Sequence, residues 1–237
     1  MSLTQLLHRK AQRGNNESMR QAQKKTDARA GAILGAARAL FGRDGFDATA
    51  MADIAARAGI AEGTVYNYFP SKQALGMAVA SDWFGEIADG VAHDLALLPD
   101  FRARLARIVA GHFAAILDAP AFYLMLLREV RAAPGYAKSD ARKENRCYTG
   151  LLLQVLRDAA ALGQVGGALP LSAMRDMVYG GVEHVALSAL VRGERLDRAA
   201  LSAQLAESWA RAFSPPVAAP DRLAAIEARL KRIEGKL

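Results

Sequence analysis

Apolar residues recur every three or four positions along most of the chain, which is the spacing of one face of an α-helix. The pattern begins near Thr26, where Ile33, Ala37 and Phe41 share one register, and it is renewed several times before Phe213. Glycine and proline residues separate the repeats, as the ends of helices require. Because no segment shows the apolar and polar alternation of a strand, we expect an all-α protein of about nine helices.

The interruptions divide the chain into four parts. Residues 1–25 are polar and basic, and they read as a flexible arm. Residues 26–72 hold three short helical patterns, and residues 73–214 hold the longer ones. Residues 215–237 combine a proline-rich linker with a short amphipathic tail. We therefore expect a small N-terminal domain followed by a larger helical one.

A short helix, a turn and a second short helix follow one another between Thr49 and Phe69. Thr49 is placed to cap the first of these helices, and Gly59 is placed to end it. The turn over residues 59–61 then leads into a helix that starts at Glu62. This order of elements predicts a helix-turn-helix.

The helix after this turn carries the polar groups that suit a DNA-reading surface. Val65 and Phe69 are four residues apart and share its inward face, which leaves Thr64, Asn67 and Tyr68 outward. An asparagine can form paired hydrogen bonds with adenine, and hydroxyl groups suit phosphates or thymine methyl groups. A lysine at the start of the next helix adds a cation beside free backbone N–H groups, which predicts an anion site.

Positive charge is concentrated in the same N-terminal part. Residues 1–72 hold eleven Lys and Arg against six Asp and Glu, whereas residues 73–237 hold twenty against eighteen. Such an imbalance indicates a polyanionic partner. The basic arm could enter the minor groove of DNA or remain merely solvated, and both alternatives stay open.

The run TAMADIAARAGIAEGTVYNYFPSKQAL, with the preceding ILGAARALFGRDGFDA, resembles the N-terminal domain of the tetracycline-repressor (TetR) family. The motif Thr-x-x-x-Asp-Ile-Ala, the turn Ala-Gly-Ile and the run Gly-Thr-Val-Tyr-x-x-Phe-x-x-Lys occur in order, and the resemblance covers residues 26–80. It implies that Asn67 reads a base and that five residues contact phosphates: Thr49, Thr64, Tyr66, Tyr68 and Lys72. Departures from the family's usual residues are Ala50, Ala52, Ala61 and Glu62, of which Glu62 repels phosphate.

The resemblance also implies a homodimer, in which the last two long helices form a four-helix bundle with those of the partner. The small and apolar residues that suit this contact are Gly181, Val185, Ala189, Leu201, Leu205, Trp209 and Phe213. An ordinary intramolecular core is the alternative interpretation of the same residues.

An effector site is implied within the helices of residues 101–192. The candidate lining residues are mostly aromatic or apolar: His112, Phe113, Ile116, Phe122, Met125, Leu126, Tyr148, Leu152 and Tyr179. The small number of charges on these faces favours an apolar or aromatic effector, such as an acyl chain or a lipophilic drug. A plain helical core is the alternative.

Together these features predict a DNA-binding transcriptional regulator, a repressor that a small apolar or aromatic effector releases from a palindromic operator. No hydrolase, nucleotide-binding or metal-binding motif occurs, so we expect no enzyme, no catalytic or metal site and no cofactor. An architectural DNA binder without a ligand is the alternative, and the long, nearly neutral C-terminal part argues against it.

The remaining features concern the place of the protein in the cell. Cys147 is the single cysteine, which excludes a disulfide framework, and we expect it to be partly buried. The chain has no apolar run of about eighteen residues and no apolar signal core. We therefore expect a protein of the cytoplasm with no membrane partner, and the family resemblance implies a bacterial protein that lies on the nucleoid when it is bound to DNA.

The C-terminal tail has a pattern of its own. Its apolar residues follow the alternating spacing of three and four that is typical of a coiled coil: Leu223, Ile226, Leu230, Ile233 and Leu237. A seam of about two heptads is too short to be stable alone. Residues 221–237 therefore either join dimers into a higher oligomer or fold back as one amphipathic helix, and both alternatives stay open.

Overall fold

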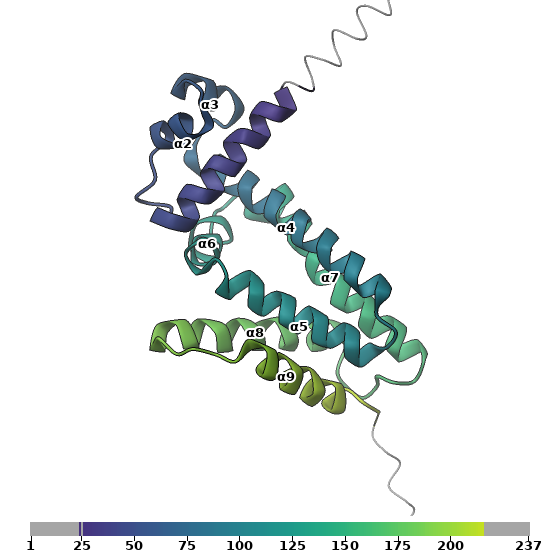
Figure 1. The fold of residues 1–237 in the computed structure, drawn as a ribbon. Helices are drawn as coiled ribbons and strands as arrows, with labels where there is room; N and C mark the ends of the chain where they lie inside the picture. Colours follow the sequence, from purple (N-terminus) through teal and green to yellow (C-terminus); the bar gives the residue numbers. More distant parts are fainter. Residues whose placement is uncertain (1–23, 25, 216–237) are drawn as a thin grey trace, which may run out of the picture. The chain divides into compact units, whose positions relative to one another are not determined.

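The computed structural model describes residue 24 and residues 26–215, which form helices joined by short turns (Figure 1). This part of the chain holds nine α-helices, one π-helical segment and one 3-10 segment, and it holds no strand. The prediction of an all-α fold is confirmed. The predicted arm of residues 1–25, apart from Lys24, and the predicted tail of residues 221–237 lie outside the described residues.

The helices follow the order that the hydrophobic pattern predicts. They are a first helix over residues 26–44, α2 (Met51–Ala58), α3 (Glu62–Tyr68), α4 (Lys72–Leu97), α5 (Phe101–Leu117), α6 (Pro120–Met125), α7 (Asp140–Ala161), α8 (Leu171–Arg192) and α9 (Arg198–Ala212). They pack as two units. Among the described residues, unit 1 runs to Ala88 and includes Asp118–Tyr148, and unit 2 comprises Asp89–Leu117 and the residues from Thr149 onwards. The functional boundary between residues 72 and 73 stays a prediction.

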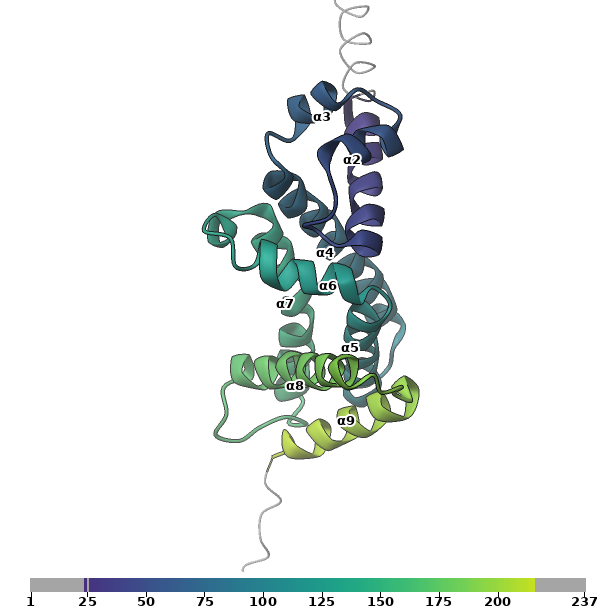
Figure 2. The ribbon, with the colours of Figure 1, turned by 90° about the vertical axis from the view of Figure 1, so that its left-hand side faces the viewer.

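Unit 1 is built around the first helix, whose inward residues Ile33, Ala37 and Phe41 are fully buried. Their burial agrees with their helical spacing in the sequence. The first helix ends at Gly45, where φ is 85°, a backbone conformation that strains any residue with a side chain. The chain then turns sharply into α2, which places the helix-turn-helix against the first helix (Figure 2).

The predicted cap of α2 is wrong. The hydroxyl group of Thr49 donates a hydrogen bond to the carbonyl oxygen of Gly45 at 2.7 Å, and Ala50 occupies the cap position. The backbone N–H of Ala50 donates instead to the carboxylate of Asp53 at 3.3 Å. Because the side chain of Thr49 is only 2% exposed, it holds the turn before α2 together from the inside.

Unit 2 packs α5 against both α8 and α9. Leu105 and Phe113 of α5 are fully buried in this contact region. The buried stripe of α9 consists of small residues that recur every four positions: Ser202, Ala206 and Ala210. Small side chains at this spacing allow two helices to approach closely.

The helix that starts at Pro120 changes its hydrogen bonding after about two turns. Regular α-helical hydrogen bonding stops at Met125, and the segment Leu126–Val130 is a π-helix. There the N–H of Arg131 donates to the carbonyl oxygen of Leu126, five residues back, at 2.9 Å. The sequence pattern missed this change because the apolar spacing hardly differs between the two helix types. A short 3-10 turn, Tyr136–Lys138, then leads into α7.

Candidate functional site

The helix-turn-helix predicted from the sequence is present in unit 1. Helix α2 ends at Gly59, whose φ of 68° is left-handed, and the N–H of Ile60 donates to the carbonyl oxygen of Ala55 at 3.1 Å. This closure turns the chain within three residues and starts α3 at Glu62. Val65 is fully buried and anchors the inward face of α3 in the core of unit 1. The predicted inward role of Val65 is confirmed.

The opposite side of α3 presents four polar or aromatic side chains to solvent. Tyr66 is 45% exposed, Asn67 is exposed, and Thr64 and Tyr68 are half-buried. Toward the described residues these four side chains make no hydrogen bond, so their donors and acceptors are free for a partner. Glu62 lies exposed at the start of the same helix, where its negative charge opposes a phosphate group.

The other two predicted DNA contacts, Thr49 and Lys72, lie in a different environment. The ammonium group of Lys72 donates to three carbonyl oxygens, those of Phe46 at 2.8 Å, Thr49 at 3.1 Å and Asp47 at 3.3 Å. The ammonium nitrogen also lies 4.7 Å from the centre of the Phe46 ring, within the range of a cation–π contact. Since an ammonium group has three N–H donors, these contacts use all of them. Lys72 thus ties the start of α4 to the turn before α2.

A second hydrogen bond joins the start of α4 to the rest of unit 1. The side-chain amide of Gln73 donates to the carbonyl oxygen of Glu129 at 2.7 Å, and Glu129 lies in the π-helical segment. Sequence reasoning missed both Gln73 and Phe46 as functional residues. Neither carries a local signal for these roles, because their partners are distant in the sequence or belong to the backbone.

The nine predicted effector-lining residues are all buried and fall into two groups. In unit 2, His112, Phe113, Ile116, Leu152 and Tyr179 are between 0% and 9% exposed. In unit 1, Phe122, Met125, Leu126 and Tyr148 are between 1% and 4% exposed. Each group belongs to an apolar core, and their role as a ligand site stays a prediction.

Each group of buried residues contains an edge-to-face contact between two aromatic rings. In unit 2 the imidazole of His112 meets the ring of Tyr179 edge-on, with 4.9 Å between ring centres. In unit 1 the indole of Trp83 contacts the ring of Phe122 in the same manner at 5.3 Å. Edge-to-face contacts of this kind stabilise a fixed arrangement of rings. The cores are therefore ordered around aromatic side chains, as a pocket for an apolar ligand requires.

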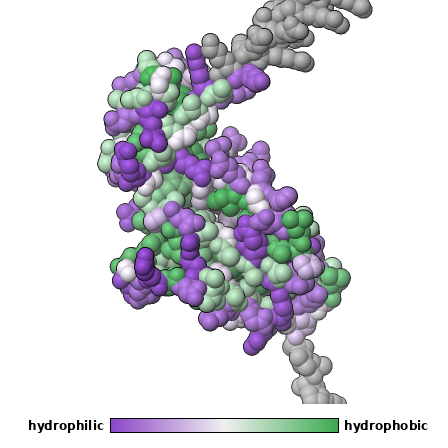
Figure 3. Space-filling model, viewed as in Figure 1, coloured by the Kyte–Doolittle hydropathy of each residue, from purple (hydrophilic) through white to green (hydrophobic). Residues whose placement is uncertain are grey.

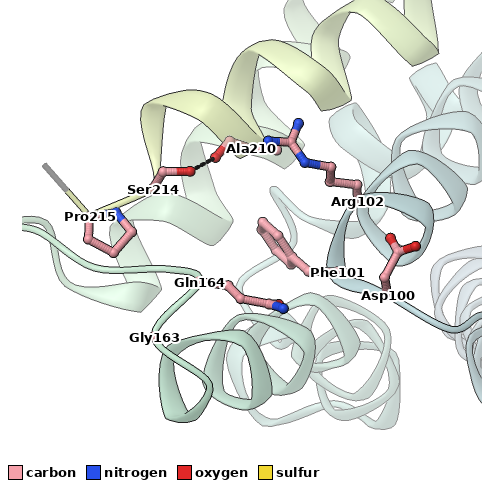
Figure 4. A pocket seen from close by; sticks show the side chains of 8 residues that line it. All are labelled: Asp100, Phe101, Arg102, Gly163, Gln164, Ala210, Ser214 and Pro215. Atoms are coloured by element: carbon pink, nitrogen blue, oxygen red, sulfur yellow. Dashed lines mark hydrogen bonds between the residues drawn. The ribbon is translucent and has the colours of Figure 1, made fainter. Parts of the chain in front are cut away.

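A hollow of about 380 Å³ lies in unit 2 beside the end of α9 (Figure 4). Phe101 projects into it, and the side chains of Arg102 and Gln164 lie on opposite sides of the ring. The hydroxyl of Ser214 on its rim donates to the carbonyl oxygen of Ala210 at 2.7 Å. None of the nine predicted effector residues lines this hollow, so it differs from the predicted effector site.

The residues predicted to form the dimer contact on α8 and α9 divide between the core and the surface of unit 2, and the contact itself stays a prediction. Ala189 and Phe213 are each 1% exposed and belong to the core of unit 2. Gly181 faces Trp209 of the same chain so closely that a Cβ atom would lie 2.8 Å from the indole. Outward residues of α8 include Met177 and Val191, which are 46% and 88% exposed.

Apolar residues on the surface are interspersed with polar ones in the view of Figure 3. Met177, His184 and Val191 are exposed on α8, and their spacing of seven residues places them on one face of the helix. Leu201 and Leu205 of α9 are half-buried. These residues, rather than Ala189 and Phe213, are available to a second copy of the chain.

The described residues hold no group of His, Cys, Asp and Glu that could bind a metal ion. Within the same part of the chain, no single helix is long and apolar enough to cross a membrane. Only the two consecutive segments Phe101–Leu117 and Pro120–Val130, taken together, reach that length and composition. Cys147 is exposed, so the expectation that it is partly buried is wrong.

The chain was compared with known proteins. Residues 33–79 match the family model described as bacterial regulatory proteins, tetR family. The fatty acid metabolism regulator protein of Bacillus subtilis (strain 168) is 21% identical over 175 residues, which cover 74% of this chain and 90% of that protein. The HTH-type transcriptional activator FasR of Mycolicibacterium smegmatis is 29% identical over 134 residues, which cover 56% of this chain and 61% of that protein.

The fold also has a solved counterpart. The crystal structure of the transcriptional regulator FadR from Bacillus subtilis, in complex with stearoyl-CoA, has a TM-score of 0.67 and 20% identity. The match covers 76% of this chain and 96% of that one. The matched family segment holds the whole helix-turn-helix and the start of α4, where the exposed face of α3 and the buried Val65 lie. Over residues 33–79, the chain is therefore similar to the tetR family of bacterial regulatory proteins.

Proposed function

We propose that the protein is a homodimeric repressor that binds a palindromic operator through α3 and leaves it when a lipophilic effector binds. The observation that carries this proposal is the two-sided character of α3, with Val65 buried and Tyr66 and Asn67 exposed. A helix of this kind can enter the major groove while its other face stays in the core. Each subunit reads one half-site, and the two half-sites lie about one turn of DNA, roughly 34 Å, apart or somewhat more.

The six predicted DNA contacts divide into two roles. Thr64, Tyr66, Asn67 and Tyr68 contact the operator, with Asn67 at the base-reading position and the others on the phosphate side. The hydroxyl of Thr49 and the ammonium of Lys72 are already bonded to backbone carbonyl oxygens. We therefore assign Thr49 and Lys72 to holding the helix-turn-helix in position rather than to binding phosphate.

Dimerisation supplies the second half-site, and the exposed face of α8 supports it. Met177 and Val191 expose apolar surface that a monomer would leave in contact with water. Packing this face against the same face of a partner satisfies the symmetry of a two-fold dimer. The half-buried Leu201 and Leu205 of α9 extend the contact.

The effector is a long-chain acyl thioester or a similar lipophile. The nine predicted lining residues support this class, because they are buried and nearly all apolar or aromatic. The similar regulator from Bacillus subtilis was solved in complex with stearoyl-CoA, which agrees with the same class. A function on DNA places the protein in the bacterial cytoplasm, on the nucleoid when bound.

Unit 1 contains a chain of contacts through which an effector can reach the DNA-binding face. Leu126, a predicted lining residue, opens the π-helical segment, and the carbonyl of Glu129 in that segment accepts from Gln73. Lys72, the neighbour of Gln73, holds the turn before α2. A shift of the π-helical segment would pull on the start of α4 and so reorient α2 and α3. Coupling of about 1–3 kcal/mol between the two sites is typical of such regulators.

The test is a gel-shift titration with an operator obtained by DNA pull-down and sequencing. Palmitoyl-CoA should lower the affinity of the wild type for this operator. Ile116→Trp fills part of the buried core, and it should abolish this response while the affinity for the operator alone is retained. Operator binding that no lipophilic compound alters would refute the effector part of the proposal. If palmitoyl-CoA instead raises the affinity for the operator, the effector promotes DNA binding rather than release.

A further inference from the structure

Four cationic side chains surround a hollow of about 500 Å³ at the start of α7, within unit 1. Lys138 lies in the turn before the helix, and Arg142, Lys143 and Arg146 lie on its first two turns. Arg142 and Arg146 are four residues apart within α7, so they lie one above the other on one face of the helix, and Lys143 lies beside Arg142. No carboxylate lines the hollow. The hollow is therefore a concentrated site of positive charge.

None of the four cations forms an ion pair with the described part of the protein. Several other arginines there form ion pairs with carboxylates, among them Arg38 with Glu86 and Arg107 with Asp94. Arg142 and Arg146 form none with the described residues. Like charges held close together repel each other unless an anion lies between them. An arrangement of this kind is favourable when a multiply charged anion binds.

The backbone that carries these cations is held in place by hydrogen bonds. The hydroxyl of Ser139 donates to the carbonyl oxygen of Tyr136 at 2.8 Å and accepts the N–H of Arg142 at 3.2 Å. The amide of Asn145 donates to the phenolic oxygen of Tyr136 at 2.9 Å. The turn before α7 is thus fixed on the first turns of the helix. A fixed turn lowers the entropic cost of gathering several cations around one ligand.

We propose that this hollow binds the phosphorylated head of an acyl-coenzyme A effector. The inference rests on the proposed function, since it assigns a second part of the same ligand. The diphosphate and the phosphate monoester of coenzyme A together carry about four negative charges near neutral pH, which matches the four cations. The guanidinium groups of Arg142 and Arg146 can each hold a phosphate through two parallel hydrogen bonds. The N-terminal end of α7 adds the positive end of its helix dipole.

The buried side of α7 provides an apolar surface for the acyl chain of the same ligand. Tyr148 follows the cationic turns directly, and it is 2% exposed and faces the core of unit 1. Its ring lies 6.3 Å from that of Phe84. Helix α7 thus carries phosphate-binding groups on its outer face and a predicted effector-lining residue on its inner face. A thioester with a charged head and an apolar chain has the same two-part character.

The experiment compares direct binding of palmitoyl-CoA and of palmitate to the full-length protein by isothermal titration calorimetry. The variant Arg142→Gln/Arg146→Gln removes two charges from the hollow and keeps side chains that can donate hydrogen bonds. We expect its affinity for palmitoyl-CoA to fall about tenfold or more, while its affinity for palmitate is unchanged. The control Arg157→Gln removes an exposed charge further along α7, outside the hollow, and should change neither affinity.

Several outcomes would overturn the assignment, each in a recognisable way. If the double variant binds palmitoyl-CoA like the wild type, the head does not bind here, although palmitoyl-CoA could still release the operator. If the variant loses affinity for the operator without ligand, the four cations contact DNA instead. If inorganic diphosphate displaces palmitoyl-CoA as well as free coenzyme A does, the hollow is a general polyphosphate site. If the wild type binds palmitate but not palmitoyl-CoA, this inference fails while a lipophilic effector remains supported.

Discussion

The ammonium nitrogen of Lys72 lies 2.8 Å from the carbonyl oxygen of Phe46, so the first residue of α4 closes the turn that precedes α2. The ring of Phe46 lies under the same ammonium group and packs against the ring of Phe41, with 5.1 Å between ring centres. The ring of Phe46 packs directly against α4 at Gly76. A Cβ atom on residue 76 would lie only 3.1 Å from this ring, so a glycine is needed for the close contact. The orientation of the helix-turn-helix therefore depends on the start of α4.

Replacement of Lys72 by methionine should weaken the binding of all DNA sequences alike and lower the stability of the protein. Methionine keeps much of the side-chain length but leaves the carbonyl oxygens of Phe46 and Thr49 without this donor. A hydrogen bond from a charged group contributes about 1.5–3 kcal/mol, and water can replace part of what is lost at this half-buried site, so we expect the free energy of unfolding to fall by about 1.5–3 kcal/mol in total. Denaturant unfolding and gel shifts at several salt concentrations measure the two effects.

The salt dependence separates this supporting role from a phosphate contact. A lysine that binds phosphate releases a counterion, and its loss reduces the slope of log affinity against log salt concentration by about one. We expect the slope of Lys72→Met to equal that of the wild type. A slope reduced by about one would show that Lys72 contacts phosphate in the complex, as the family resemblance implies.

Asn67 should determine one base position in each half-site. Asn67→Ala should cost about 1–3 kcal/mol on the preferred operator and leave the affinity for operators altered at that position nearly unchanged. Glu62→Gln is the matched comparison on the same helix, since it removes a negative charge and should strengthen the binding of all sequences. A selection experiment on randomised half-sites measures both. An unchanged preference in Asn67→Ala would assign base reading to another residue of α3.

Gln73 should couple the effector to the operator without contributing to operator affinity itself. Gln73→Ala removes the hydrogen bond to the carbonyl oxygen of Glu129, so we expect unchanged operator binding and a smaller effect of palmitoyl-CoA on it. The loss should be a fraction of the total coupling of about 1–3 kcal/mol. Gln154→Ala is the control, because its exposed amide pairs with Asp158 at 2.7 Å in unit 2. If palmitoyl-CoA changes the operator affinity of both variants equally, Gln73 does not take part in the coupling.

The exposed face of α8 should hold the dimer together. Met177→Glu/Val191→Glu places charges on this face, so light scattering should report a monomer and the gel shift should lose its specific complex. Burying an unpaired charge is too costly for the contact to persist. Leu162→Glu is the control, since Leu162 is 73% exposed and lies just beyond α7. A dimer that survives the double substitution would place the interface elsewhere.

Glu207 should make the stability of unit 2 depend on acid pH. Hydrogen bonds from Arg102 and then Arg211 hold the pKa of the Glu207 carboxyl below its usual value of about 4.5. A carboxyl whose pKa is lowered by folding stabilises the folded state above its unfolded pKa, and the effect is lost as the pH falls through the folded pKa. Near neutral pH the wild type should therefore have a higher melting temperature than Glu207→Gln. This difference in melting temperature should shrink below pH about 4.5. A difference independent of pH would contradict the assignment.

The sequence by itself determined the all-α fold, the helix-turn-helix and the inward position of Val65. These features depend on local rules, namely the periodicity of apolar residues and the left-handed conformation that glycine allows at Gly45 and Gly59. The ends of the long helices follow from proline and glycine for the same reason. The outward face of α3 was predictable once its inward face was known.

Only the tertiary structure decided what the polar groups of this scaffold contact. The sequence shows Lys72 as a free cation beside a predicted DNA-reading helix, and Thr49 as a helix cap. The fold instead brings the carbonyl oxygens of residues 46, 47 and 49 to the ammonium group, although they are more than twenty residues away in the chain. Likewise it leaves Arg142 and Arg146 without an ion pair to the described residues while pairing Arg102 with Glu207. A charged side chain has no periodic partner in the sequence, because its partner is set by which segments pack together in space.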